Sequence, residues 1–166
     1  MKEKENFLDY SILTTSYGIN EEILVPYIKK LLLVIKSTAQ YFGNIVYVFE
    51  KKEEKLKTNL EKLFPSSSNP IKFLINPSIK RGFSVCLNFG IRNTSANFIL
   101  RCDPDDIFLD NKIYVQISKM YSSKADISYT DIKTIYGISN YPKNIRSFLF
   151  KLSLGFNPIA HTSVAF

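Results

Sequence analysis

The sequence predicts an α/β fold with a mainly parallel sheet that is covered by helices on both faces. Strand-like and helix-like segments alternate in the order β-α-β-α-β-α-β, which favours parallel strands joined by helical crossovers. The chain has 166 residues, and its 45% hydrophobic and 14% aromatic content is ample for the packed core of one domain. No apolar stretch reaches the roughly 18 to 20 residues of a membrane-spanning helix, and the charged start lacks an apolar signal core. We therefore expect a globular, cytoplasmic protein.

The first strand and the first helix are defined by a change in residue pattern. Residues 10–17, YSILTTSY, are rich in β-branched and aromatic residues and predict a strand. A helix is expected next, with Asn20 as a candidate cap and Pro26 marking either an early turn or the true helix start. Its apolar stripe consists of Leu24, Ile28, Leu31, Leu32 and Ile35.

The second strand and helix are followed by a chain breaker. NIVYVFE at 44–50 predicts a strand, and the Lys/Glu-rich segment 51–63 predicts a helix with its charges in solvent. The breaker PSSSNP at 65–70 separates this helix from the next strand. The inner face of the helix is expected at Leu56, Leu60 and Leu63.

Two further strands and two helices complete the alternation. IKFLIN at 71–76 and NFILR at 97–101 predict strands. FSVCLNFGI at 83–91, entered through Gly82, and IYVQISKMY at 113–121 predict helices.

Charge and cysteine content narrow the function classes only slightly. The formal net charge of +7 suggests an anionic partner, which could be a nucleic acid, a nucleotide, a phosphorylated lipid or a membrane face. Cys86 and Cys102 lie far apart with only His161 to accompany them, which argues against a zinc site or a disulfide framework. We expect both cysteines to be small buried apolar residues.

An acidic cluster follows the fourth predicted strand. Asp103, Asp105 and Asp106 lie where a strand of a parallel sheet ends, which is where such sheets bind ligands. Adjacent carboxylates repel unless they are neutralised, and their oxygens suit Mg²⁺ or Mn²⁺ holding a diphosphate. An acidic turn capping a helix near Asn111 is an equal alternative on this pattern alone.

Four segments together resemble a known family. They are SILTTSY at 11–17, RGFSVCLNFGI at 81–91, FILRCDPDD at 98–106 and NPIAHTSVAF at 157–166. In these segments the chain resembles the family 2 inverting glycosyltransferases of the GT-A fold, especially bacterial enzymes that build capsule and lipopolysaccharide sugars. The joint match is far more specific than any one segment.

The resemblance implies a site for a nucleotide sugar. Thr15 and Tyr17 would lie at the nucleotide base, and Glu50 falls where many members place an aspartate against uracil. Arg81 and Asn88 would flank the nucleotide from the third helix.

The same resemblance implies a metal site in the acidic cluster. Asp103 would lie near the ribose and, with Asp105, bind the Mn²⁺ or Mg²⁺ that bridges the diphosphate, while Asp106 would support the turn. His161 would have a positional role near the acceptor or the phosphates, and structural packing is an equal alternative for it.

The implied activity is metal-dependent transfer, with inversion, of a sugar from a UDP-sugar donor to a surface glycan or lipid-linked saccharide. Family members usually continue beyond the segment at 157–166 to a carboxylate that serves as the general base. We therefore expect residues 1–166 to form a single GT-A-like domain without the acceptor-side part, and the base to lie beyond Phe166. The alternative is a catalytically silent nucleotide-binding or partner-binding domain left by truncation.

Other classes lack the residues that they need. A dehalogenase-type phosphatase requires a later lysine and a second acidic pair, where only the scattered Asp126 and Asp131 are found. A dinucleotide-binding dehydrogenase requires G-x-G-x-x-G after the first strand, and nucleic-acid binding is not supported by any RNP-like or KH-like signature. The segment 141–156 mixes basic and apolar residues, and predicts either a helix packed on the sheet or a peripheral contact with an anionic membrane.

Overall fold

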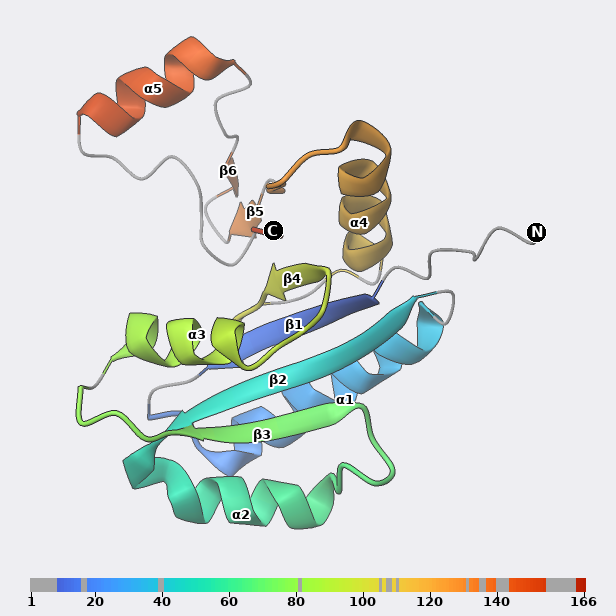
Figure 1. The fold of residues 1–166 in the computed structure, drawn as a ribbon, viewed down its shortest axis with the longest axis vertical. Helices are drawn as coiled ribbons and strands as arrows, with labels where there is room; N and C mark the ends of the chain where they lie inside the picture. The colour runs from blue at the N-terminus through green and yellow to red at the C-terminus, as the bar shows by residue number, and fades with distance from the viewer. Residues whose placement is uncertain are drawn as a thin grey trace.

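The structure is a computed structural model that confirms the α/β architecture (Figure 1). It describes residues 9–15, 18–38, 41–80, 82–104, 106, 109, 111–130, 132–134, 137–139, 144–154 and 164–166. Strands and helices alternate through its first four strands, as the sequence predicts.

A four-stranded parallel sheet forms the centre of the fold. Its strands are β1 (Asp9–Thr15), β2 (Phe42–Glu50), β3 (Ile71–Asn76) and β4 (Phe98–Arg101), in the spatial order β3-β2-β1-β4. Every neighbouring pair is parallel. The carboxyl ends of these strands therefore lie along one edge of the sheet.

The first helix, α1 (Glu21–Ser37), begins where the sequence predicts. The Asn20 side chain accepts a hydrogen bond from the Ile23 N–H and so caps the helix. Pro26 lies inside the helix, in an early turn. The predicted apolar stripe is buried against the sheet.

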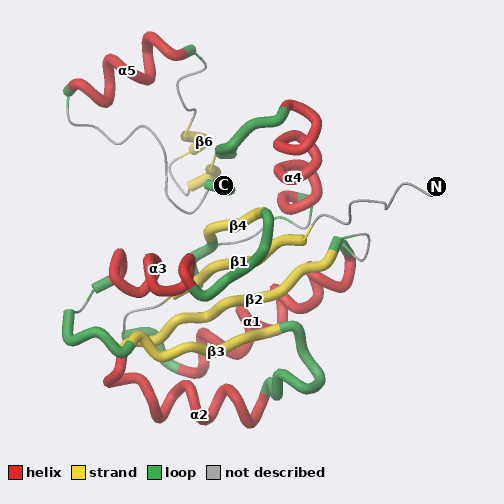
Figure 2. The backbone as a smooth tube through the Cα atoms, viewed as in Figure 1, coloured by secondary structure: helices red, strands yellow, loops and turns green. Residues whose placement is uncertain are grey.

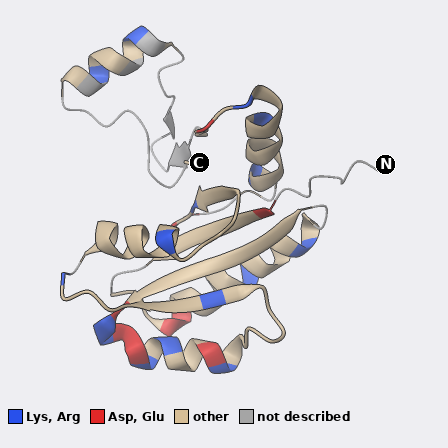
Figure 3. Cartoon of the chain, in the orientation of Figure 1, with Lys and Arg blue, Asp and Glu red and all other residues tan. Residues whose placement is uncertain are grey.

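The second helix, α2 (Glu54–Leu63), follows a 3₁₀ turn at Lys51–Glu53 and exposes alternating acidic and basic residues (Figure 3). Leu60 is fully buried, as expected. The expectation for Leu63 is wrong, because its side chain is 53% exposed. The helix ends at this residue, and Phe64 is buried in its place.

Helices cover both faces of the sheet. The larger core cluster joins the strands to α1, α2 and α4 (Lys112–Ser123), and the smaller one joins the opposite face to α3 (Phe83–Arg92). Cys102 belongs to the first cluster and Cys86 to the second, and both are free thiols. This confirms their expected role as small buried residues.

Beyond α4 the chain adds two strands that the sequence patterns do not predict, and a helix within the segment 141–156. The strands β5 (Ile132–Thr134) and β6 (Gly137–Ser139) form an antiparallel pair, and α5 (Ile145–Ser153) lies apart from the main sheet (Figure 2). The expectation that this helix packs on the main sheet is therefore wrong for α5. None of the helices in the described residues is long and apolar enough to cross a membrane.

The last three residues return to the free edge of β4. The Ile99 N–H donates to the Phe166 carbonyl (2.6 Å), and the Arg101 N–H donates to the Val164 carbonyl (2.9 Å). Ala165 also exchanges backbone hydrogen bonds with Ser128. β4 is thus held on both edges, by β1 on one side and by residues 164–166 on the other.

Candidate functional site

Polar side chains gather at the carboxyl edge of the parallel sheet. Thr15, Glu50 and Arg101 are the last residues of β1, β2 and β4, and Asn76 is the last residue of β3. All four are buried. Buried polar groups are normally hydrogen-bonded, so the partners of these side chains show how this edge of the sheet is organised.

Both oxygens of the Glu50 carboxylate contact other groups of the chain. Its Oε1 accepts a hydrogen bond from the Gly82 N–H (2.9 Å), and its Oε2 lies 3.6 Å from the Lys52 Nζ. The Glu50 N–H in turn donates to the Glu53 Oε2 (2.9 Å). Glu50 therefore ties the end of β2 to the loop that follows β3.

Asn76 holds the other end of that loop. It pairs with Glu50 in the register of β2 and β3, and its Oδ1 accepts a hydrogen bond from the Ser78 N–H (3.1 Å). Its Nδ2 donates to the Cys86 Sγ (3.7 Å) on α3. At the far end, Gly82 has φ of +116°, a conformation that L residues rarely adopt. Two neighbouring strand ends thus fix the loop at 77–82.

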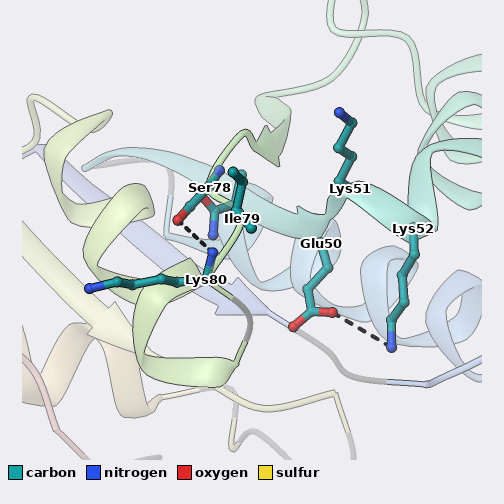
Figure 4. Close-up of a pocket in the computed structure, with 7 residues that line it drawn as sticks. Glu50, Lys51, Lys52, Ser78, Ile79 and Lys80 are labelled. Carbon is teal, nitrogen blue, oxygen red and sulfur yellow. Dashed lines mark hydrogen bonds and ion pairs between the residues drawn. The ribbon is translucent and has the colours of Figure 1, made fainter.

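A cavity of about 360 Å³ lies between this loop and the end of β2 (Figure 4). This volume lies within the range of small-molecule sites, roughly 300 to 1,000 Å³. In Figure 4 the Lys52 side chain reaches toward Glu50, whereas Lys51 extends away from it. The cavity is lined by Glu50, Lys51, Lys52, Asn76, Ser78, Ile79 and Lys80.

The acidic turn follows β4 directly, as the sequence predicts. The Arg101 Nη2 lies 2.5 Å from the Asp103 Oδ1, and Nη1 donates to the Cys102 carbonyl (3.2 Å). The Arg101 guanidinium also stacks over the Phe83 ring, with its Cζ 4.4 Å from the ring centroid. The Asp106 N–H donates to the Asp103 carbonyl (3.1 Å), which closes the turn.

Basic groups of the chain offset the charge of this turn. Arg101 is paired directly with Asp103. Burial lowers the pKa of the Lys112 ammonium at the start of α4, and the nearby Asp106 charge opposes that shift. The crowding of carboxylates is therefore relieved in part by the protein's own cations, so that neutralisation alone does not require a metal ion.

The described part of the turn nevertheless fits a hard cation in the chemistry of its donors. Asp103 and Asp106 supply carboxylate oxygens from one short turn. Mg²⁺ commonly takes only one or two protein carboxylates, together with substrate phosphates. Among the described residues no group of three His, Cys, Asp or Glu side chains could hold a metal ion.

Comparison of the sequence with known families identifies the family of this chain. The profile of glycosyl transferase family 2 matches residues 11–162. The chain belongs to glycosyl transferase family 2. No curated protein matches it significantly.

Two solved structures of low sequence identity have a similar fold. S. aureus TarS 1–349 matches with a TM-score of 0.58 and 14% identity over 78% of this chain, and the chain spans 37% of that protein. The 4-diphosphocytidyl-2C-methyl-D-erythritol synthase of Anaerococcus prevotii DSM 20548 matches with a TM-score of 0.57 and 12% identity over 96% of this chain and 71% of that one. These similarities confirm the predicted nucleotide-diphospho-sugar transferase fold.

The family 2 residues predicted from the sequence occupy different environments in the structure. Glu50 lines the cavity and Asp103 begins the acidic turn. Thr15 is buried, and its hydroxyl donates to the Val48 carbonyl (2.7 Å). Asn88 is exposed on α3. Four of the predicted residues lie outside the described part of the chain, namely Tyr17, Arg81, Asp105 and His161.

Sequence reasoning missed several residues that organise the candidate site. Arg101 lies inside the family-like segment at 98–106, but the sequence does not indicate its pairing with Asp103. Asn76 ends a correctly predicted strand, which places it at the ligand-binding edge. Phe83 and Lys112 give no local signal beyond their position at the start of a helix.

Proposed function

We propose that this domain binds a UDP-linked sugar and transfers the sugar, with inversion, to an acceptor hydroxyl of a bacterial surface glycan of the capsule or lipopolysaccharide type. The acceptor is a glycan or a lipid-linked saccharide. The observation that carries the proposal is the placement of the lined cavity and the acidic turn on the same carboxyl edge of one parallel sheet. That edge is where α/β sheets bind nucleotides.

The cavity beside Glu50 is proposed to receive the uracil base. Uracil carries one N–H donor and two carbonyl acceptors, which complement a carboxylate surrounded by Lys51, Lys52 and Lys80. Thr15 and Tyr17 are proposed to complete the base site. Arg81 and Asn88, by the family resemblance, are proposed to flank the rest of the nucleotide.

The acidic turn is proposed to face the ribose and the diphosphate. Asp103 and Asp105 would hold Mn²⁺ or Mg²⁺, and Asp106 supports the turn through its N–H bond to the Asp103 carbonyl. The metal ion, when bound, supplies Lewis-acid stabilisation of the departing diphosphate. His161 is proposed to lie near the acceptor or the phosphates, and the base that deprotonates the acceptor is proposed to come from sequence that follows residue 166 in longer family members.

A silent nucleotide-binding domain is the second candidate. It is favoured by the pairing of Asp103 with Arg101, because this contact stabilises the turn without any metal ion. The two candidates differ in one measurable property. A transferase hydrolyses its donor slowly when no acceptor is present, whereas a silent domain only binds it.

Calorimetry with UDP and GDP, each with and without Mn²⁺, tests the proposal. The parent is expected to bind UDP in preference to GDP and more tightly with Mn²⁺, and Asp105→Ala is expected to lose the Mn²⁺-dependent gain. Asp126→Ala, which removes an exposed aspartate beyond α4, is the matched control and is expected to behave as the parent. UDP binding that is indifferent to Mn²⁺ would contradict metal-dependent donor binding, and UDP release from UDP-glucose or UDP-galactose would exclude the silent domain.

We also propose a peripheral position on the cytoplasmic face of the membrane, where lipid-linked acceptors are found. The support is α5, on which the side chains of Leu149 and Phe150 are 53% and 64% exposed. Arg146 and Lys151 are exposed on the same helix. Basic and apolar side chains together suit the surface of an anionic bilayer.

A further inference from the structure

We propose that Phe83 is a positioning residue that orients the acidic turn through Arg101, so that the first turn of α3 links the nucleotide cavity to Asp103. This inference rests on the proposed function, because it concerns the same donor site. It adds a residue that has no polar group and makes no contact with a donor in the proposal above. Its role follows from a continuous series of contacts.

The first contact joins Phe83 to Arg101. The Arg101 guanidinium lies over the Phe83 ring at 4.4 Å from its centroid, and Arg101 is only 4% exposed. A buried guanidinium has little water to solvate it, so the face of an aromatic ring is a favourable neighbour. The ring also blocks one side of the guanidinium plane, which limits the directions in which its N–H groups can point.

The second contact joins Arg101 to the turn. Nη2 lies 2.5 Å from the Asp103 Oδ1, and Nη1 donates to the Cys102 carbonyl. One side chain thus holds both the backbone that enters the turn and the first carboxylate of the turn. A rotation of the guanidinium would release both at once.

The Arg101 backbone has little freedom of its own. It pairs with Leu13 of β1 on one edge, and its N–H donates to the Val164 carbonyl (2.9 Å) on the other. Because the main chain is fixed from both sides, the orientation of the guanidinium depends on its side-chain torsions. Phe83 is therefore placed to select among those torsions.

Phe83 is in turn fixed from the side of the cavity. The preceding residue, Gly82, donates its N–H to the Glu50 Oε1 at 2.9 Å. The loop that lines the cavity and the ring that supports Arg101 are therefore consecutive in the chain. A ligand that shifts this loop would move the ring, and through it the Asp103 carboxylate.

The test compares three single variants in UDP calorimetry with and without Mn²⁺. Phe83→Leu removes the ring but keeps a similar apolar volume, and it is expected to lower the Mn²⁺-dependent gain in UDP affinity at least five-fold. Phe83→Tyr keeps the ring and is expected to retain the gain. Phe89→Leu, at a half-buried phenylalanine packed against the core on the same helix, is the matched control and is expected to retain it too. Equal losses in Phe83→Leu and Phe89→Leu, or no loss in Phe83→Leu, would overturn the proposal.

A second measurement separates this inference from the proposed function. If the parent binds no UDP, the proposed function fails, but the link from Phe83 to Asp103 can still be measured in the unfolding of Phe83→Leu, Asp103→Asn and the double variant. The urea midpoints are expected to be non-additive, because each substitution removes support for the same guanidinium. Additive midpoints would show that Phe83 and Asp103 act independently, and would overturn the positioning role whatever the chain binds.

Discussion

The ring of Tyr10 on β1 occupies the space that a side chain at position 43 on β2 would need. The two residues are paired in the register of the parallel strands, and a Cβ atom on Gly43 would overlap the outer end of the Tyr10 ring. The ring cannot swing away freely, since the Tyr10 hydroxyl is hydrogen-bonded to the Thr38 Oγ1 (2.7 Å). Glycine at position 43 is therefore required by close packing between neighbouring strands.

Gly43→Ala is expected to destabilise the fold by about 1 to 3 kcal/mol, because the added methyl group overlaps the fully buried Tyr10 ring. Urea unfolding measures the loss. Gly90→Ala is the comparison: its new methyl would crowd the buried ends of Leu13 and Val48, but alanine favours a helix by about 1 kcal/mol over glycine, so its net loss is expected to be smaller. A loss at position 90 as large as that at position 43 would contradict this account.

The Cys102 thiol makes the stability depend on alkaline pH. Burial raises its pKa from 9.0 to about 11, so the folded chain keeps the proton over a range in which the unfolded chain releases it. Its stabilising contribution is complete below pH 9 and is lost as the pH rises toward 11, by up to about 2 to 3 kcal/mol. Cys102→Ala is expected to flatten the fall in unfolding free energy between pH 8.5 and 10.5. Burial also raises the pKa of the Cys86 thiol, but less strongly. Cys86→Ala is therefore expected to flatten the fall less. Parallel profiles for the parent and Cys102→Ala would exclude the thiol as the cause.

The parts of the fold that the sequence predicts are those that a local pattern determines. IKFLIN forms β3 with the bounds predicted, and Asn20 caps α1 because its side chain lies within reach of the first free N–H groups. Leu63 shows where periodicity fails. Its spacing places it on the inner face, but the helix ends there and Phe64 fills the core instead.

In the candidate site, too, some features are predictable from local sequence and others are not. A strand followed by acidic residues predicts where Asp103 lies, because the carboxyl ends of parallel strands share one edge. The pairing of Arg101 with Asp103 is not predictable from local sequence, since the guanidinium is also supported by Phe83, which lies in another element. The return of residues 164–166 to β4 is likewise a long-range pairing that no periodic pattern records.

The exposed apolar side chains of α5 are expected to bind anionic membranes. Replacement of both Leu149 and Phe150 by serine should weaken binding to vesicles of phosphatidylglycerol and phosphatidylcholine about ten-fold or more, since each buried apolar side chain contributes roughly 1.5 to 3 kcal/mol. Leu33→Ser, at a 66% exposed leucine of α1, is the control and should leave binding unchanged. Vesicle co-sedimentation measures the effect. Equal binding to vesicles of phosphatidylcholine alone would show that the basic residues do not contribute to membrane binding.

Glu50 is expected to act on the loop at 77–82 through its hydrogen bond to Gly82, and on the nucleotide through its charge. Glu50→Ala leaves the Gly82 N–H without its acceptor, which should cost about 1 to 3 kcal/mol in unfolding free energy. Glu50→Gln keeps a carbonyl oxygen for that N–H and should lose much less stability. It should nevertheless bind UDP more weakly, because the amide has lost the charge that complements the uracil N–H.

Lys52→Ala separates the ion pair from the loop contact. This pair spans 3.6 Å and its lysine side chain is 42% exposed, so its loss should change the unfolding free energy by no more than about 0.5 kcal/mol. Urea unfolding and UDP calorimetry on the three variants give both quantities. If Glu50→Ala were as stable as Glu50→Gln, the carboxylate would not be the anchor of the loop, and a direct contact with the base would be its remaining role.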